Sequence, residues 1–289
     1  LLSNIRGHLC DMDRLRELFS AKGSTLIEDC AHTNRSRWNG TRSGNFGLAG
    51  CFSTQSYKHL NAGEGGLITS DDPEFIARAT ILSGSYMLYD RHGAGPASDV
   101  YADVRLDMPN MSARMDNLRA AILRPQLTRL DHNIERWNER YARVANGLAT
   151  CPAIRLPKRP AEEFFVGSSI QFCLDGATKR TAGAVVDKAR RNGVFLKWFG
   201  AEEPEGYTSA HASWRYVPAQ TLSRTDRILA TLFDLRLPLT LTLADCDLIA
   251  EHIVDTVEDV VGAPASRDSA ASANRAARPP LTTLASTER

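Results

Sequence analysis

The segment from Met12 to Asp29 constrains the fold more than any other part of this 289-residue chain. Residues 25–29 are a short apolar run typical of a buried strand. A helix followed by such a strand is the pattern of a parallel α/β sheet. Ligands bind such sheets at the carboxyl ends of the strands, which is where Asp29 falls. The apolar residues that predict the helix, which Gly23 is placed to end, are Met12, Leu15, Leu18 and Phe19.

A lysine follows the next strand candidate. Residues 49–53 form that short strand, and Lys58 comes five residues after Ser53. The spacing suits pyridoxal 5′-phosphate (PLP), because an amine can form a Schiff base with its aldehyde while a carboxylate keeps its pyridine nitrogen protonated. Each residue alone has an ordinary alternative. Asp29 can cap the following helix, and Lys58 can be a solvated surface lysine.

Composition excludes several other classes. The chain has 35 basic and 34 acidic residues and a formal charge of +1, which gives no reason to expect nucleic acid or a membrane surface as partner. No apolar stretch approaches the roughly 20 residues of a membrane span, and no secretory signal precedes the first element. Six cysteines without a C-x-x-C pair indicate reduced thiols in a cytoplasmic protein. No cluster has metal-ligand spacing.

The glycines at 63–66 do not form a phosphate-binding P-loop. They lie between Lys58 and a strand candidate at 66–70, whereas a P-loop joins a strand to a helix. A tight turn is the better interpretation.

The middle of the chain predicts one long helix. Asp72-Pro73 starts a shorter helix through about Leu82, and residues 84–110 mix Gly, Pro, Asp and Tyr, as in a long irregular loop. Residues 112–148 are then helical, with Pro125 expected to break or kink the helix. Apolar residues alternate by three and four beyond the proline, which predicts a packed seam: Leu127, Leu130, Ile134, Trp137, Tyr141, Val144 and Leu148.

The second half predicts a smaller α+β domain. Its expected elements are a strand at 168–174, a helix at 179–192, a strand at 194–198 and helices at 222–233 and 243–261. Residues 262–289 are dominated by Ala, Ser, Arg, Pro and Thr, and are expected to be disordered. We therefore divide the chain into 1–125, a PLP-binding part; 126–261, a linker helix with the small domain; and 262–289, the tail.

The motifs resemble one family throughout residues 5–261. Ile27-Glu28-Asp29-Cys30-Ala31-His32, Cys51-Phe52-Ser53, Lys58 and Gly63-Glu64-Gly65-Gly66 resemble the DegT/StrS aminotransferases, as do Arg114-Met115, Leu118-Arg119-Ala120-Ala121, Gln126-Leu127 and Leu237-Pro238-Leu239. The resemblance implies a fold-type-I PLP-dependent transferase. In this fold a large parallel or mixed sheet domain is joined to a smaller α+β C-terminal domain.

The resemblance also implies roles for five residues. Lys58 is the Schiff-base lysine and proton shuttle, and Asp29 is the partner of the pyridinium nitrogen. His32 contacts the cofactor ring, with a satisfied core histidine as the alternative. Ser53 binds the phosphate, with a strand-end serine bonded to backbone as the alternative. Ser112 stands where the family often has an asparagine that reaches the phosphate of the neighbouring subunit, so a homodimer is expected.

Three departures from the family pattern affect these expectations. Thr33, Asn34 and Arg35 replace small residues and glycine after His32. An aromatic-rich segment, residues 193–200, stands where the family shapes its acceptor pocket, and it can equally be small-domain core. The family's N-terminal phosphate loop and ring-stacking aromatic have no counterpart, so we expect a chain that lacks an N-terminal part.

We therefore predict a PLP-dependent aminotransferase with a ping-pong Schiff-base mechanism. By the resemblance, an amino acid donor, glutamate or glutamine, passes its amine to a keto-sugar or related cyclic ketone. One alternative is a PLP-dependent sugar dehydratase, in which histidine replaces the lysine, and Lys58 argues against it. The other is a non-catalytic or inactive truncated relative, motivated by the missing N-terminal segment.

Overall fold

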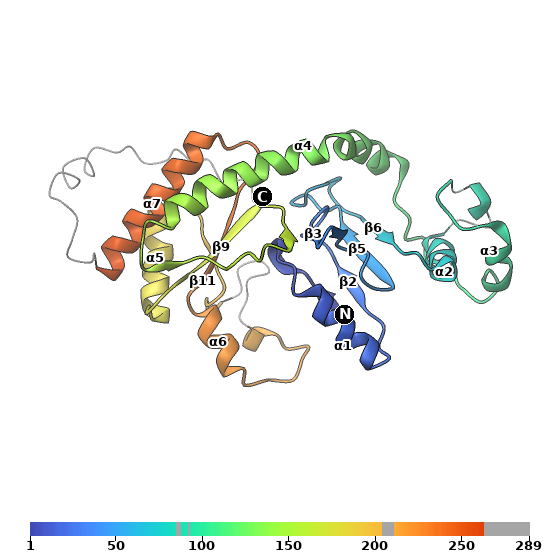
Figure 1. Cartoon of the computed structure of the whole chain (residues 1–289), viewed down its shortest axis with the longest axis horizontal. Coiled ribbons are helices and arrows are strands. Elements are labelled where there is room, and N and C mark those ends of the chain that lie inside the picture. The colour runs from blue at the N-terminus through green and yellow to red at the C-terminus, as the bar shows by residue number, and fades with distance from the viewer. Residues whose placement is uncertain (85–87, 92, 204–210, 263–289) are drawn as a thin grey trace. The chain divides into compact units, whose positions relative to one another are not determined.

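In a computed structural model of the protein, two compact units are described over residues 1–84, 88–91, 93–203 and 211–262 (Figure 1). The first unit comprises Leu1–Glu135 and Arg159–Val166, and the second comprises Arg136–Lys158 and Gly167 onward. The boundary drawn from the sequence at 125/126 therefore differs from the division of the structure, which falls further along the long helix. Residues 159–166 return to the first unit because their strand pairs there. The expected tail lies outside the described residues, apart from Gly262.

The first unit is built on a mixed four-stranded sheet. Its strands are β1 (Leu2–Ser3), β2 (Ile27–Asp29), β5 (Ala49–Ser53) and β6 (Gly66–Thr69), in the order β1-β2-β5-β6. The first three are parallel and β6 runs antiparallel to β5. The predicted strands 49–53 and 66–70 are confirmed, and β2 is shorter than the predicted 25–29. The sequence did not predict β1, because two residues carry no periodicity.

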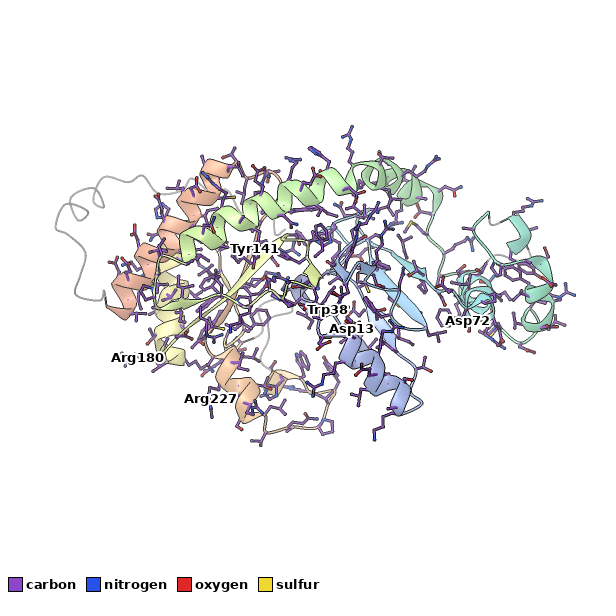
Figure 2. The ribbon with its side chains drawn as sticks, viewed as in Figure 1. Asp13, Trp38, Asp72, Tyr141, Arg180 and Arg227 are labelled. Carbon is purple, nitrogen blue, oxygen red and sulfur yellow. The ribbon has the colours of Figure 1, made fainter. Side chains whose placement is uncertain are left out.

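Helix α1 (Met12–Ala21) confirms the first predicted helix. The Asp11 side chain caps it by accepting a hydrogen bond from the Arg14 amide at 3.0 Å. Met12 is fully buried and packs in a cluster with Leu26 and Trp38, which lie beyond the helix. The Trp38 indole Nε1 donates to Asp13 Oδ2 at 2.9 Å, and both residues are labelled in Figure 2. This contact fixes α1 to the segment that follows β2.

The segment expected to be a simple connection forms a small antiparallel sheet. Strands β3 (Arg37–Trp38) and β4 (Thr41–Arg42) are a hairpin, and β8 (Glu163–Phe164) pairs with the other edge of β3. Asn39 and Gly40, the two turn residues, both have positive φ, at 46° and 81°. Asn-Gly suits such a two-residue hairpin turn.

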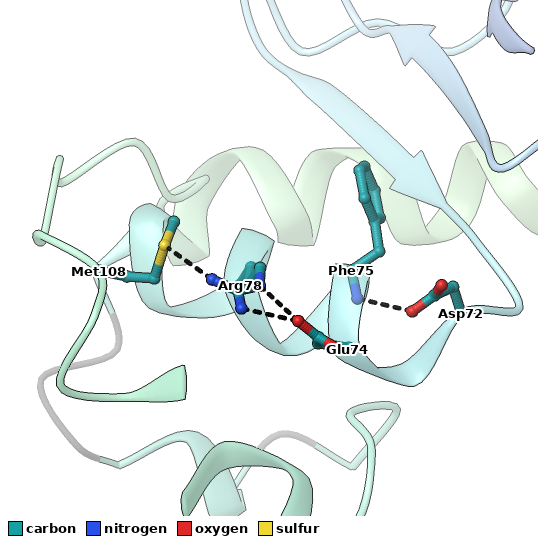
Figure 3. Close-up of polar contacts among 5 residues, drawn as sticks. All are labelled: Asp72, Glu74, Phe75, Arg78 and Met108. Atoms are coloured by element: carbon teal, nitrogen blue, oxygen red, sulfur yellow. Dashed lines mark hydrogen bonds and ion pairs between the residues drawn. The ribbon is translucent and has the colours of Figure 1, made fainter. Parts of the chain in front are cut away.

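Helix α2 (Pro73–Ser83) confirms the predicted helix 73–82 and shows how the sequence starts it (Figure 3). The Asp72 carboxylate accepts a hydrogen bond from the Phe75 amide at 2.8 Å, and proline stands at the first position of the helix. One turn on, Arg78 donates to Glu74 through Nε and Nη2, and its Nη1 also approaches the Met108 sulfur at 3.5 Å.

The prediction of a long irregular loop over 84–110 is wrong for the described residues. They contain a 3₁₀ turn, η2 (Tyr89–Arg91), and helix α3 (Ser98–Val104). Tyr89 and Tyr101 stack with ring centroids 4.2 Å apart, and both belong to a buried cluster with residues of α2. The apolar residues that fold the segment are spread among Gly and Pro, so a composition-based prediction missed them.

Helix α4 (Asn117–Leu148) is continuous through Pro125. It starts five residues later than predicted, and of the predicted break or kink at Pro125 the helix shows no break. Leu123 and Leu130 are buried on either side of the proline, so packing holds the helix where one backbone hydrogen bond is lost. The seam is confirmed from Leu130 to Leu148, and includes Tyr141 (Figure 2). Leu127, predicted to begin it, is 45% exposed.

The second unit is an antiparallel sheet with two long helices. Its strands are β7 (Ile154–Arg155), β9 (Ser169–Leu174), β10 (Lys197–Trp198) and β11 (Leu232–Arg236), in the order β10-β11-β9-β7. The central strand β9 is buried along its whole length, and Phe172 stacks on Phe233 at 5.2 Å. Helices α5 (Lys179–Arg191) and α7 (Leu243–Val261) pack on one another and match their predictions. The smaller α+β unit is confirmed.

Two predictions for this unit are wrong. The helix predicted over 222–233 is a short helix, α6 (Ser223–Leu229), followed by β11, so Phe233 lies in a strand. Of the strand predicted over 194–198, only the last two residues form a strand, β10. Of the aromatic-rich segment, Trp198 is half-buried and donates to the Ala230 carbonyl at 2.9 Å, while Phe195 is 41% exposed. A 3₁₀ turn, η3 (His211–Ser213), was not predicted.

None of the helices in the described residues is long and apolar enough to cross a lipid bilayer. The six cysteines all lie in the described residues and all are free thiols. Four are buried, Cys51 is half-buried and Cys10 is exposed.

Candidate active site

The carboxyl end of β2 carries Asp29 on a defined face of the sheet. Asp29 pairs with Ser3 of β1 on one side and with Cys51 of β5 on the other. Paired residues of parallel strands point to the same face. The Ser3 hydroxyl accordingly donates to Asp29 Oδ2 at 3.1 Å, and the Ala31 amide donates to Oδ1 at 3.0 Å. Two donors thus orient the carboxylate.

Ser53 ends the neighbouring strand on the same face as Asp29. It lies two residues beyond Cys51 on β5, so its side chain points to the side that Cys51 and Asp29 share. Its hydroxyl accepts a hydrogen bond from the Gln55 amide at 3.3 Å. This is the backbone contact that a strand-end serine makes, and the hydroxyl keeps its own proton for another acceptor.

Lys58 meets His32 at the same edge of the sheet. Lys58 Nζ lies 2.8 Å from His32 Nε2, although the two residues come from the segments that follow different strands, β5 and β2. An ammonium has donors only, so His32 Nε2 is the acceptor and the proton of the neutral ring sits on Nδ1. The loop that carries Lys58 is closed at its base, where the Thr54 amide donates to the Gly65 carbonyl and the Ala62 amide donates to the Thr54 carbonyl.

The glycine cluster turns this loop back into β6. Gly63 and Gly65 have φ values of 86° and 125°, which side chains rarely adopt. A Cβ at Gly65 would also lie 2.8 Å from Thr54 Oγ1. The interpretation of a tight turn is therefore confirmed.

Ser112 occupies a turn beside the end of α2. Its backbone is left-handed, with φ at 50°, and its amide donates to Asn110 Oδ1 at 2.8 Å. A Cβ added to Gly84 would lie 3.1 Å from the Ser112 Cα, and Arg114 Nη1 donates to the Gly84 carbonyl at 2.9 Å. The expected contact of Ser112 with a neighbouring subunit stays a prediction.

Four of the five predicted residues therefore lie on two adjacent strand ends. Asp29 and Ser53 share a face, and Lys58 and His32 are in hydrogen-bond contact. The set offers an amine, an imidazole, a carboxylate and a hydroxyl. In the part of the chain that the structure describes, no group of three His, Cys, Asp or Glu residues is arranged to hold a metal ion.

Comparison with known proteins matches the sequence to a family. The sequence model of the DegT/DnrJ/EryC1/StrS aminotransferase family matches residues 1–254.

This chain belongs to the DegT/DnrJ/EryC1/StrS aminotransferase family.

Curated relatives of this DegT-family chain are named as aminotransferases. It is 34% identical over 161 residues to a dTDP-3-amino-3,4,6-trideoxy-α-D-glucose transaminase of Streptomyces venezuelae. The aligned region covers 53% of this chain and 38% of that protein. It is 33% identical over 140 residues to an L-glutamine:scyllo-inosose aminotransferase of Streptomyces griseus, over 48% of this chain and 32% of that protein.

The fold agrees with that of a solved aminotransferase structure. The aminotransferase TlmJ of Streptoalloteichus hindustanus superimposes with a TM-score of 0.73 at 22% identity, over 90% of this chain and 66% of that one. The predicted architecture, a mixed-sheet unit with a smaller α+β unit, is thereby confirmed. The chain spans less than half of the length of the curated relatives it matches.

Sequence reasoning gave no role to Glu28, which this DegT-family chain uses as a buried anchor. Its side chain is fully buried, and its two oxygens accept hydrogen bonds from the amides of Gly44, at 2.9 Å, and Phe46, at 2.8 Å. The carboxylate therefore fixes the loop that leads into β5. Burial, together with the nearby Glu28 charge, raises the pKa of the Cys30 thiol to about 12. An acid inside an apolar strand was the available signal, because such acids are buried only with partners.

Proposed function

We propose that this protein is a PLP-dependent aminotransferase. The observation that carries the proposal is the contact of Lys58 Nζ with His32 Nε2 at 2.8 Å, on the strand end next to the one that presents Asp29. Family membership supports the same activity.

The residues present suit the chemistry of this cofactor. PLP, when bound, supplies an electron sink for the bond that is broken at the α-carbon of the substrate. Lys58 would attach it covalently and then carry a proton to and from the substrate carbon. The Asp29 carboxylate, oriented by Ser3 and Ala31, would hold the proton on the pyridine nitrogen.

His32 and Ser53 would complete the binding set. The His32 imidazole, which contacts Lys58 through Nε2, would contact the cofactor ring. The Ser53 hydroxyl has a proton available for a phosphate oxygen. Because the chain spans 66% of the aligned TlmJ structure, we expect further phosphate-binding groups to come from parts of the fold that this chain does not span.

The substrates are an amino acid donor and a cyclic ketone acceptor. We assign glutamate or glutamine as the donor and a keto-sugar or related cyclic ketone as the acceptor, in a two-half ping-pong cycle. Support comes from the two Streptomyces relatives, one of which is named for L-glutamine and a cyclic inosose and the other for an amino sugar. A panel of ketones, followed by the mass of each aminated product, identifies the acceptor.

The proposal includes a homodimer in the cytoplasm. Ser112 would then reach the cofactor phosphate of the second subunit, for which its exposed turn beside α2 is suited. Six free thiols are typical of a reducing compartment. Sedimentation of the purified protein tests the assembly.

The decisive experiment replaces the lysine. The wild-type protein should show visible absorbance from covalently held PLP, and borohydride should fix the cofactor mass on the peptide that contains Lys58. Lys58→Ala should lose both the absorbance and transamination, while its circular dichroism is unchanged. A variant that keeps the band and turns over normally would refute the assignment.

A further inference from the structure

Lys58 and His32 approach each other from two separate segments. Both segments are bound to the same helix, α4. In the first unit, the loop that carries Lys58 is bound to α4 through Gln126, and the segment that follows His32 is bound to α4 through Asp131.

The first of these contacts is a paired hydrogen bond. The Asn61 amide, three residues beyond Lys58, donates to Gln126 Oε1 at 2.9 Å, and Gln126 Nε2 donates to the Asn61 carbonyl at 2.7 Å. The second proton of Nε2 goes to the Ile122 carbonyl of the helix at 3.0 Å. One carboxamide therefore holds both polar groups of a loop residue and is itself held by its own helix.

The second contact comes from a residue in an uncommon conformation. Arg35, three residues after His32, has φ at 71°, a value at which the backbone of any residue other than glycine is strained. Its guanidinium reaches Asp131 Oδ2 at 3.3 Å. Gln126 and Asp131 lie within two turns of each other on α4.

We propose that Gln126 is a positioning residue that sets the contact between Lys58 and His32. The proposal rests on the proposed function for its role in transamination. The carboxamide holds Asn61, the closed loop transmits that position to Lys58, and Arg35 holds the opposite side. Without the Gln126 carboxamide, the loop that carries Lys58 shifts, and the Lys58 amine loses its contact with the His32 imidazole.

The test measures the Lys58 amine directly, on protein from which hydroxylamine has removed any bound PLP. The protein is treated briefly with acetic anhydride, and acetylation of Lys58 is read by peptide mass against Lys22, an exposed lysine of the same unit. Gln126→Met keeps the length of the side chain and removes its hydrogen bonds. It should raise Lys58 labelling at least about threefold. Arg129→Met places the same new side chain at an exposed position of α4 and should change nothing.

A double-mutant cycle with His32 separates positioning from general loosening. His32→Ala should raise Lys58 labelling by itself, and adding Gln126→Met should then have little further effect, because both changes break one contact. Unchanged labelling in Gln126→Met would overturn the proposal, and so would two effects that multiply. If Gln126→Met fails to fold, Gln126→Glu replaces it in the same labelling cycle. Glutamate keeps an acceptor for the Asn61 amide but loses the donor to the Asn61 carbonyl.

The loaded enzyme gives a second reading. With PLP bound, Gln126→Met should lower kcat about tenfold or more with little change in KM, because a small displacement of a reacting group is costly. Cofactor attachment that survives Lys58→Ala would refute the proposed function, yet it would leave the labelling cycle interpretable. The two failures are therefore distinguishable.

Discussion

Adjacent carboxylates of β2 have opposite environments because successive side chains of a strand point to opposite faces. Glu28 is fully buried and accepts two backbone hydrogen bonds, while Asp29 is half-buried at the edge where Lys58 and His32 meet. Two adjacent acidic residues therefore have different roles, Glu28 as a structural anchor and Asp29 as a candidate cofactor partner. The face of the sheet on which each side chain lies determines its role.

Next to this pair, Cys30 gives a prediction for high pH. Burial raises the pKa of its thiol from the ordinary 9.0 to about 12. The unfolded chain therefore releases this proton at lower pH than the folded chain, so the thiol's contribution to stability is complete below pH 9 and is lost as the pH rises toward 12. Urea unfolding across that range should show a steeper loss for the wild-type protein than for Cys30→Ala. Parallel curves for the two proteins would contradict the assignment.

At the scale of the element, α7 shows what local sequence can specify. Its bounds, Leu243–Val261, were predicted from the sequence, and its start is set by a capping box. The Asp245 carboxylate accepts a hydrogen bond from the Thr242 amide at 2.7 Å, and Thr242 Oγ1 accepts one from the Asp245 amide at 3.1 Å. The hydrogen bond from the Thr242 amide also lowers the pKa of Asp245.

Removing one half of this box should weaken the helix. Thr242→Ala should lower the free energy of unfolding by about 1 kcal/mol, because the amide at the third helical position loses its acceptor. Thr240→Ala, an exposed threonine just before the helix, is the control and should be neutral. Chemical denaturation of the three proteins measures the difference. Equal losses in the two variants would mean that the cap contributes nothing.

Other elements were mispredicted because contacts distant in sequence decide them. Residues 232–236 continue an apolar pattern that suits a helix, but they pair with β9 along their whole length and become a strand. Pro125 should end a helix by local rules, yet α4 runs through it between buried leucines. Local propensity is weak, and tertiary packing overrides it.

At the scale of the whole molecule, β6 stands out as an apolar strand at the end of the sheet order. Leu67 and Ile68 are 39% and 51% exposed. A flat apolar edge strand promotes association with other chains. We expect light scattering of this chain to rise with concentration, and Ile68→Lys to reduce the rise. Leu18→Lys removes an equally exposed leucine from a helix, and it should leave the scattering unchanged. A similar decrease in both variants would point to general surface hydrophobicity.

The sequence alone determined the class of sheet, the carboxyl ends of β2 and β5, the aminotransferase family and the residues with which to look for a cofactor site. These follow from periodicity and from motifs that are contiguous in the chain. Only the tertiary structure decided that Ser3 orients Asp29, that Glu28 anchors a loop, that α4 passes Pro125, and that Gln126 and Arg35 hold the segments around Lys58 and His32. Each of these depends on hydrogen bonds or packing between residues far apart in the chain, which no local pattern encodes.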